Sequence, residues 1–329
     1  MLGADLLYTL EGVSDPDGDW MTRHLDVHPR AATDIALLRF GPTANLELFQ
    51  YTSPDQRTEP PRNSDVGGHR LTVDTEDFDR ALEYLRSVDG ARVQGEPQEV
   101  KEGPAAGCRW IYFQAPWGMQ LELRQVPDVL PFEAAGEERL YRPEPGWWGP
   151  GKHGVPGARG VLQAGYTVAD LAEAVAFHVN VLGGEVLYRE SLRFDADYAS
   201  RQFAIDQAVE VETAVVRLGP VTNVELAQYT VSDQRTERPR NSDVGGHHLA
   251  FFVDDVDAAV AWLRTVPGVE VLGEPQLIQD GGPIHGDYWV YFKAPSGFQM
   301  EVLNMPDGMP YERFTDARRF GPSDSWENR

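Results

Sequence analysis

Hydrophobic and polar residues follow a repeating order between residues 160 and 305. An alternating stretch, GVLQAGYTV, is followed by a segment in which Leu171, Val175, Val179 and Leu182 recur at helical spacing. Alternation predicts a strand, and helical spacing predicts a helix with one buried face. Three more strands are predicted at EVLYRES, VETAVVRLG and NVELAQYT. The order therefore predicts one βαβββ module.

The same order recurs after a polar loop. HHLAFFV is predicted to be a strand, and Asp257–Arg264 a short helix that buries Val256, Val260 and Leu263. The strands VEVLGEP, DYWVYFKAP and FQMEVLN follow. Two successive βαβββ modules predict an α+β fold with mixed sheets that curve around a shared cavity.

The N-terminal half of the chain repeats this pattern. NLELFQYT at Asn45–Thr52 matches NVELAQYT at Asn223–Thr230, and WIYFQAPWGMQLEL matches WVYFKAPSGFQMEVL. Such internal similarity indicates duplicated structural units. We expect four regions: a first domain, a Pro/Gly-rich connector, a second domain that carries the active site, and a tail, at 1–126, 127–159, 160–305 and 306–329.

The first domain is predicted to be incomplete. LGADLLY at Leu2–Tyr8 matches LGGEVLY at Leu182–Tyr188, so the opening strand and helix of the first module have no counterpart. Two interpretations stay open: a start that lies upstream, or a barrel that lacks these elements. An amphipathic strand and helix missing from a core leave apolar surface uncovered.

A polar loop is almost identical in both halves. DQRTEPPRNSDVGG starts at Asp55 and DQRTERPRNSDVGG at Asp233, and two residues after each copy stand Arg70 and His248. Its glycines and its Asn-Ser-Asp run are typical of a connector between modules. A sharper interpretation is a rim element in which Arg235 and Arg240 bind a substrate carboxylate or a neighbouring carboxylate. The presence of two copies favours a structural role.

Strand alternation assigns one polar residue to the concave face of each key strand of the C-terminal half. These residues are Gln163, Glu225, His248 and Glu301. Any one of them alone is more often a solvent-facing or hydrogen-bonded residue. Two carboxylates, an imidazole and an amide oxygen together suit a divalent cation with open positions for water or substrate. We therefore expect a metal site.

The chain resembles the vicinal oxygen chelate superfamily, which includes glyoxalase I, bleomycin-resistance proteins and extradiol dioxygenases. The resemblance lies in GYTVADLAEAVAFHVNVLGG, HHLAFFVDDVDAAVAWL and YFKAPSGFQMEVL. It implies paired βαβββ modules, with metal ligands on the first and last strands of each module. By position these are Gln163, Glu225, His248 and Glu301. The implied cofactor is Zn, Ni, Co, Mn or Fe.

The ligand types favour one reaction class within this resemblance. Gln163 stands where extradiol dioxygenases have a histidine, which disfavours ring cleavage. The set is similar to that of some glyoxalase I enzymes, which implies a lyase or isomerase acting on a small oxygenated substrate. Glu301 is then the first choice for the general base and Glu225 the second. The alternative is a non-catalytic protein that sequesters an antibiotic or a similar small molecule.

The first half has a different set at the matching positions. Glu47 and Glu122 match Glu225 and Glu301, whereas Arg70 replaces His248 and Arg124 replaces Leu303. A guanidinium repels a metal ion but pairs well with carboxylates. We expect Arg70 and Arg124 to neutralise Glu47 and Glu122, either as a structural core or as an anion site.

The remaining features bound location and partners. His285, in the Gly-rich loop GGPIHGDYW, is a further candidate for substrate contact. The formal net charge of −23 disfavours binding to nucleic-acid phosphates. No apolar run approaches the roughly 18 residues of a membrane span. The single cysteine is typical of a reducing compartment, so we expect a cytoplasmic protein. The superfamily forms barrels within one chain and between chains, which leaves a homodimer possible.

Overall fold

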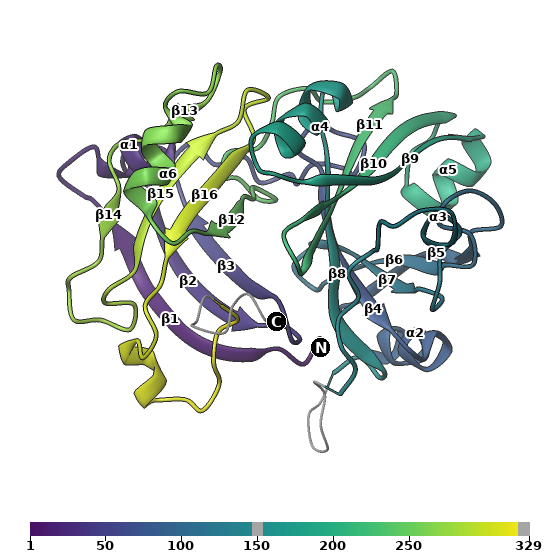
Figure 1. Cartoon of the computed structure of the whole chain (residues 1–329), viewed down its shortest axis with the longest axis horizontal. Coiled ribbons are helices and arrows are strands. Elements are labelled where there is room, and N and C mark those ends of the chain that lie inside the picture. The colour runs from purple at the N-terminus through teal and green to yellow at the C-terminus, as the bar shows by residue number, and fades with distance from the viewer. Residues whose placement is uncertain (147–153, 322–329) are drawn as a thin grey trace. The chain divides into compact units, whose positions relative to one another are not determined.

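The computed structural model describes residues 1–146 and 154–321 of the chain. The described residues form a mixed α+β structure in which strands outnumber helices, as the sequence predicts (Figure 1). They divide into two compact units. Unit 1 contains residues 1–3, 40–43 and 61–238, and unit 2 contains residues 4–39, 44–60 and the chain from 239 onwards.

The units differ from the sequential domains expected at 1–126 and 160–305. The chain passes from unit 2 to unit 1 after Pro60 and returns after Arg238, inside the two copies of the repeated loop. Unit 1 therefore combines the second and third modules, and unit 2 combines the first and fourth. The repeat correctly marks the modules, but local periodicity contains no information on which module pairs with which.

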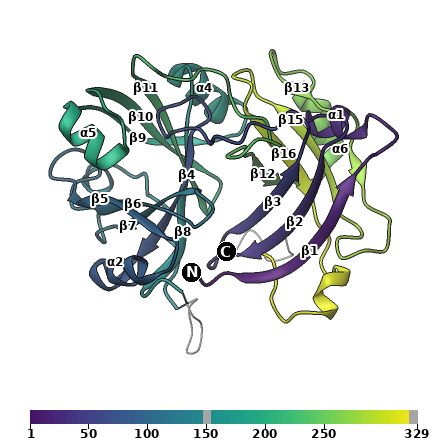
Figure 2. The ribbon, with the colours of Figure 1, turned by 180° about the vertical axis from the view of Figure 1, so that it is seen from behind.

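Unit 1 contains one curved eight-stranded sheet (Figures 1 and 2). Its order is β5 (Arg92–Glu99), β6 (Arg109–Gln114), β7 (Gln120–Gln125), β4 (His69–Thr75), β8 (Ala158–Thr167), β11 (Thr222–Thr230), β10 (Val209–Leu218) and β9 (Glu185–Phe194). The first strands of the two modules, β4 and β8, pair antiparallel at the centre, and each pairs in parallel with the last strand of its own module.

Helices cover the convex face of this sheet. α4 (Leu171–Asn180) packs on β9, β10 and β11, and α2 (Phe78–Ser87) packs on β5 and β7. Asp170 caps α4, because its side chain accepts a hydrogen bond from the Glu173 amide. The remaining helices of unit 1 are α3 (Pro131–Ala135) and α5 (Ala196–Phe203).

Unit 2 contains two smaller sheets. One is the meander β1 (Asp5–Ser14), β2 (Ala32–Arg39) and β3 (Asn45–Thr52). The other has the order β12 (Leu249–Phe252), β16 (Gln299–Asn304), β15 (Tyr288–Lys293) and β13 (Glu270–Val271), and β14 (Gln276–Leu277) also pairs with β15. The helices are α1 (Trp20–Leu25), α6 (Val256–Leu263) and the 3-10 turn η1 (Pro310–Arg313). In α6, the predicted residues Val256, Val260 and Leu263 are buried.

Unit 2 differs from unit 1 in the strands that lie beside β3. In unit 1, β8 lies between β11 and β4, but no described strand lies between the matching strands β3 and β12 of unit 2. Val224 and Leu226 of β11 are fully buried, whereas Leu46 and Leu48 at the matching positions of β3 are partly exposed. Leu6 on β1 is 52% exposed. Apolar residues of this sheet are therefore less covered than Val224 and Leu226 of unit 1.

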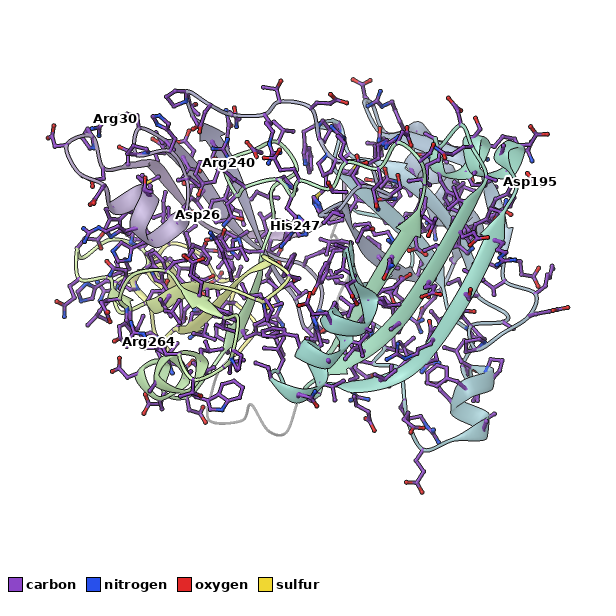
Figure 3. The ribbon with its side chains drawn as sticks, turned by 90° about the horizontal axis from the view of Figure 1, so that it is seen from above. Asp26, Arg30, Asp195, Arg240, His247 and Arg264 are labelled. Carbon is purple, nitrogen blue, oxygen red and sulfur yellow. The ribbon has the colours of Figure 1, made fainter. Side chains whose placement is uncertain are left out.

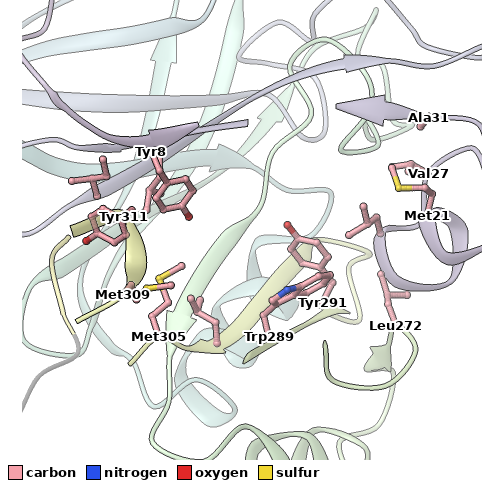
Figure 4. Close-up of a cluster of buried hydrophobic side chains, with 14 residues drawn as sticks. Tyr8, Met21, Val27, Ala31, Leu272, Trp289, Tyr291, Met305, Met309 and Tyr311 are labelled. Atoms are coloured by element: carbon pink, nitrogen blue, oxygen red, sulfur yellow. The ribbon is translucent and has the colours of Figure 1, made fainter. Parts of the chain in front are cut away.

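The core of unit 2 is rich in aromatic side chains. Tyr8 on β1, Trp289 and Tyr291 on β15 and Tyr311 on η1 belong to one buried cluster (Figure 4). The Tyr8 and Tyr311 rings lie 5.5 Å apart, and the Trp289 and Tyr291 rings lie 5.3 Å apart. Tyr291 of this cluster also contacts the His248 ring, at 4.8 Å between ring centroids.

Candidate functional site

The four predicted metal ligands are divided between the two units. Gln163 on β8 and Glu225 on β11 belong to unit 1, and their side chains are hydrogen-bonded to each other. His248, just before β12, and Glu301 on β16 belong to unit 2. The structure therefore replaces the single expected site with two polar clusters, one in each unit. We call them cup 1 and cup 2.

Cup 1 is organised around the guanidinium of Arg70 on β4. Its Nη2 lies 2.7 Å from Oε1 of Glu225, and its Nε lies 3.5 Å from Oε2 of Glu122. Arg70 is opposite Gly165 in the β4–β8 pairing, and a Cβ at that glycine would lie 3.1 Å from the guanidinium carbon. A glycine on the facing strand thus leaves room for a buried arginine.

A second arginine completes the charge balance of cup 1. Arg124 Nε lies 2.6 Å from Oε1 of Glu122, and Thr72 donates a 3.0 Å hydrogen bond to the other oxygen of Glu122. Burial would raise the pKa of Glu225, but Arg70 and Arg124 outweigh it and hold that pKa below its usual value. The two carboxylates of cup 1 are thus matched by two guanidinium groups.

Cup 2 has an imidazole where cup 1 has a guanidinium. His248 Nε2 lies 3.6 Å from Oε2 of Glu301 and 3.3 Å from the Tyr291 hydroxyl. The imidazole ring also contacts Phe49 on β3, at 5.6 Å between ring centroids. Burial lowers the pKa of His248 to about 4, so the imidazole is neutral at physiological pH.

Cup 2 contains more acidic groups than its basic groups neutralise. Burial raises the pKa of Glu301 to about 8. Burial, with added repulsion from Glu301, also raises the pKa of Glu47 on β3 and that of Asp287 to about 8. Arg319 opposes this shift at Asp287. Cup 2 therefore favours the binding of a proton or another cation at these carboxylates.

The comparisons with known proteins identify the family of the chain. A family model described as the glyoxalase/bleomycin resistance protein/dioxygenase superfamily matches residues 162–284. A 2-epi-5-epi-valiolone epimerase from Actinomyces sp. is 56% identical over 147 residues, which are 45% of this chain and 79% of that protein. The chain belongs to the glyoxalase/bleomycin resistance protein/dioxygenase superfamily. The family predicted from the sequence is confirmed.

Solved structures of the superfamily share the fold. The glyoxalase I of Zea mays aligns over 92% of this chain and 92% of its own, with a TM-score of 0.53 and 17% sequence identity. A mutant of the same maize enzyme gives a TM-score of 0.52 and 18% identity over the same shares. The predicted glyoxalase-like α+β fold is therefore confirmed. None of the helices in the described residues is long and apolar enough to cross a membrane.

The superfamily resemblance implies a metal, and the two cups differ as hosts for one. Within residues 1–146 and 154–321, no group of three or more His, Cys, Asp or Glu side chains is arranged to hold an ion. Cup 1 does not fit a metal, because the Arg70 guanidinium already pairs with both of its carboxylates. Cup 2 fits by its donor chemistry, with a neutral imidazole and carboxylates in excess of their basic neighbours.

Arg235 and Arg240, which the sequence predicts at a substrate rim, bind carboxylates of the protein itself. In unit 1, Arg235 Nε lies 2.7 Å from Oδ2 of Asp65, and Gln234 donates to the carbonyl oxygen of Ser64 at 2.6 Å. Arg62 also binds Asp233, with Nη1 2.7 Å from its Oδ2. We call these contacts between the start of one loop copy and the end of the other a clasp. The expected carboxylate partner is present, and it belongs to the protein itself.

Unit 2 contains the same clasp with the two copies exchanged. Arg57 Nε lies 2.8 Å from Oδ2 of Asp243, and Gln56 donates to the Ser242 carbonyl oxygen at 2.7 Å. Arg240, labelled in Figure 3, binds both the side chain and the carbonyl oxygen of Asp55. Each copy supplies the start of one clasp and the end of the other. This reciprocity accounts for the near identity of the loops, because a change in one copy affects a clasp formed with the other.

Two other histidines are placed by the structure. His285 is exposed and accepts a hydrogen bond from the Gly281 amide at 3.1 Å, in a local turn. This contact gives no support to the expected substrate role. His247, labelled in Figure 3, packs against Phe298 at 5.2 Å, so it lies on the other face from His248, as alternation predicts.

Sequence reasoning missed part of cup 2. Glu47 was expected beside Arg70, but it lies in unit 2 and interacts with Glu301 and His248. Asp287 was not singled out, although alternation along DYWVYFK places it on the same face as Trp289 and Tyr291. A comparison of the two halves contains a signal for Asp287, since the matching residue of the first half is Cys108.

Proposed function

We propose that this protein is a metal-dependent epimerase or isomerase that acts on a small hydroxylated ketone in cup 2. The contrast in charge between the cups carries this proposal: cup 1 contains its own cations, whereas cup 2 has buried carboxylates in excess of its basic groups. The 56% identity to a protein named 2-epi-5-epi-valiolone epimerase supports this reaction class.

Three residues of cup 2 would hold the metal: Glu301, His248 and Glu47. They occupy the first- and last-strand positions at which the superfamily resemblance places ligands, and the fourth such position lies on the strand that has no described counterpart in unit 2. A divalent cation bound there would polarise the substrate carbonyl and lower the barrier to removing the neighbouring proton. Proton removal and proton donation are assigned to side chains of the protein.

Epimerisation beside a carbonyl needs a proton to leave one face of a carbon and a proton to arrive at the other. Glu301 on β16 and Glu47 on β3 extend from different sheets of unit 2, and the charge of Glu301 raises the pKa of Glu47. We assign Glu301 as the base that accepts the proton from the Cα–H bond, leaving an enolate. Glu47, as a carboxylic acid, then donates a proton to the opposite face.

The hydroxyl of Tyr291 lies 3.3 Å from His248 Nε2 and belongs to the same cup. Because this hydroxyl and the Tyr291 ring both contact the imidazole, Tyr291 is suited to orient His248. The buried aromatic cluster of Tyr8, Trp289 and Tyr291 excludes water from this part of unit 2, which strengthens the charge interactions of the cup.

Cup 1 would serve as a structural scaffold with no part in the reaction. Its four charged groups neutralise one another and are almost completely buried: Arg70 is 4% exposed and Glu122 is fully buried. The previously expected base Glu225 is engaged there by Arg70 and Gln163, so the second catalytic carboxylate is assigned to Glu47 instead.

A proton-exchange experiment tests the proposed function. The purified chain is incubated in D2O with 2-epi-5-epi-valiolone and, in turn, Mn²⁺, Zn²⁺, Co²⁺, Ni²⁺ or anaerobic Fe²⁺, and the substrate is followed by NMR. We expect deuterium at the carbon beside the ketone together with the epimeric product, and neither after treatment with EDTA. Metal binding and ligand binding without any exchange would instead favour the non-catalytic binding protein.

A further inference from the structure

A buried carboxylate stands beside the proposed catalytic groups without a role in metal or proton transfer. Asp287 directly precedes β15, and alternation puts its side chain on the face of Trp289 and Tyr291. On the neighbouring strand, Glu301 pairs with Tyr291 across the sheet. Asp287 therefore faces the same side of the sheet as Glu301, two same-face positions along from Tyr291, with the Trp289–Leu303 pair between them.

Electrostatic coupling supports this placement independently of alternation. Burial raises the pKa of Tyr8 on β1 well above its usual value, and Glu47, Asp287 and Glu301 raise it further. The hydroxyl group of Tyr291 responds to the same three carboxylates. One tyrosine from each sheet of unit 2 thus responds to Asp287, which puts this carboxylate inside the cup.

Asp287 is buried more completely than its hydrogen bonds explain. The residue is 5% exposed, and its Oδ1 has no hydrogen-bond partner among the described residues. The guanidinium of Arg319 acts on Asp287 only at a distance, because it donates to the carbonyl oxygens of Met305, Pro306 and Gly321. A buried carboxylate oxygen without a donor is costly, so a site of this kind suits a ligand that supplies one.

The fold does not require a carboxylate at this position. The matching residue of unit 1 is Cys108, which is 1% exposed in an apolar cluster with Val126 and Leu130. An uncharged side chain therefore fits at this point of the module. The acid in unit 2 is a feature of cup 2, the cup in which we place the reaction, and it is absent from cup 1.

We propose that Asp287 is a substrate-binding residue that accepts a hydrogen bond from a hydroxyl group remote from the reacting carbon. The proposal rests on the proposed function and names the substrate class more narrowly, as a ring ketone with hydroxyls at distant positions. Oδ1 receives the hydroxyl hydrogen, and the rings of Trp289 and Tyr291 on the same face contact the C–H surface of the substrate (Figure 4). Asp287 thus selects for hydroxylated rings.

The test compares Asp287→Cys, which copies the residue of unit 1, with the unsubstituted protein. Two probes are used: 2-epi-5-epi-valiolone, and 2-hydroxycyclohexanone, which has no remote hydroxyls. At about pH 9, above the Asp287 pKa of about 8, the carboxylate is ionised, and loss of a charge-assisted hydrogen bond predicts a rise of about 10- to 100-fold in KM or Kd for the first probe. We expect kcat to change less than threefold, the second probe to be handled equally by both proteins, and Mn²⁺ affinity to be unchanged.

Three results would overturn the assignment. They are an unchanged KM for the first probe, an equal loss on both probes, and loss of Mn²⁺ binding, which would make Asp287 part of the cation site. Failure of the proposed function gives a different pattern. The unsubstituted protein would then bind 2-epi-5-epi-valiolone without exchanging its proton, and weaker binding of that probe by Asp287→Cys would still support the proposal. Absence of binding by the unsubstituted protein would refute it.

Discussion

The two cups are built from the same kind of module and differ in whether a guanidinium pairs with their carboxylates. In cup 1, Arg70 contacts both Glu122 and Glu225, and Arg124 adds a second positive charge. In cup 2, the residue that matches Arg70 is His248, which is neutral, and the residue that matches Arg124 is Leu303. Two exchanges of side chain, one at the start of the module's first strand and one on its last strand, thus separate a self-neutralised core from a cup in which acidic groups outnumber basic ones.

Under the proposed function, the comparison explains how one of two duplicated cups becomes structural while the other carries the reaction. A buried carboxylate pair is stable only with a compensating charge. An internal guanidinium supplies that charge permanently, which closes the position to a ligand. A cup without it retains the electrostatic potential to bind a metal ion, at the expense of stability when no ion is bound.

The sharpest way to break the comparison is the same substitution at matched positions. Glu301→Gln removes the proposed base of cup 2, and we expect kcat to fall by about 10²- to 10⁴-fold, the usual contribution of general acid–base catalysis. Because Glu301 is a buried acid in an acidic cup, its loss should leave the melting temperature unchanged or raise it. The measurement is turnover of 2-epi-5-epi-valiolone combined with thermal unfolding.

The matched control is Glu122→Gln in cup 1. We expect it to retain kcat in the folded protein and to lower the melting temperature, since Arg70 and Arg124 both lose charge compensation. A loss of kcat in Glu122→Gln larger than that in Glu301→Gln would reverse the assignment of the two cups.

A second prediction concerns the stability of unit 1. Glu225→Gln leaves the buried Arg70 without its closest carboxylate, and we expect a loss of about 3–5 kcal/mol in the free energy of unfolding. Arg70→Met combined with Glu225→Gln should recover part of this loss, because the pair is then removed together. Urea denaturation measures both values. No recovery in the double variant would contradict a direct charge pairing.

The loop copies allow a third prediction. Asp65→Asn in unit 1 and Asp243→Asn in unit 2 break equivalent clasps, and we expect similar losses of about 1.5–3 kcal/mol from charge-assisted hydrogen bonds. A loss confined to one of the two aspartates would mean that the clasps are not equivalent.

The clasp of unit 1 also has a pH signature. Burial opposes ionisation of Asp65, but hydrogen bonds from Arg62 and Arg235 outweigh it and lower its pKa from 3.8 to about 2. The stabilisation is therefore complete above about pH 4 and is lost as the pH falls towards 2. We expect the stability difference between the unsubstituted protein and Asp65→Asn to shrink across this range in acid-unfolding measurements.

The smallest expected effect sharpens the comparison at Gly165. A methyl group there would lie 3.1 Å from the Arg70 guanidinium carbon, so Gly165→Ala should cost about 1–3 kcal/mol through crowding of unit 1. Combination with Arg70→His, which copies unit 2, should reduce the cost. Equal costs in both backgrounds would show that Arg70 is not the group that needs the space.

Much of this molecule could be predicted from its sequence. Alternation and helical spacing predicted the strands, their inward residues and the helices, because these depend on neighbours along the chain. It assigned Gln163, Glu225, His248 and Glu301 to inward faces but placed them around one point. The passage of the chain from unit 1 to unit 2 after Arg238 divides that set, and this passage depends on long-range pairing that periodicity does not encode.

The charged residues of the repeated loop indicate how the modules pair. Each copy begins with Asp-Gln-Arg and ends with Arg-Asn-Ser-Asp, so the start of one copy complements the end of the other. The same charges also allow a clasp within each copy, which is why the sequence left the partner open. The exchange became apparent once Arg57 was found bound to Asp243 and Arg235 to Asp65.

The central claim is that cup 2 accepts a cation from solution and cup 1 does not. Its most direct test is a Mn²⁺ titration followed by electron paramagnetic resonance, on the unsubstituted protein, Glu301→Gln and Glu122→Gln. We predict one Mn²⁺ per chain in the unsubstituted protein and in Glu122→Gln, and binding weakened at least tenfold in Glu301→Gln. Binding that survives in Glu301→Gln but is lost in Glu122→Gln, or no Mn²⁺ binding by any of the three proteins, would contradict the account.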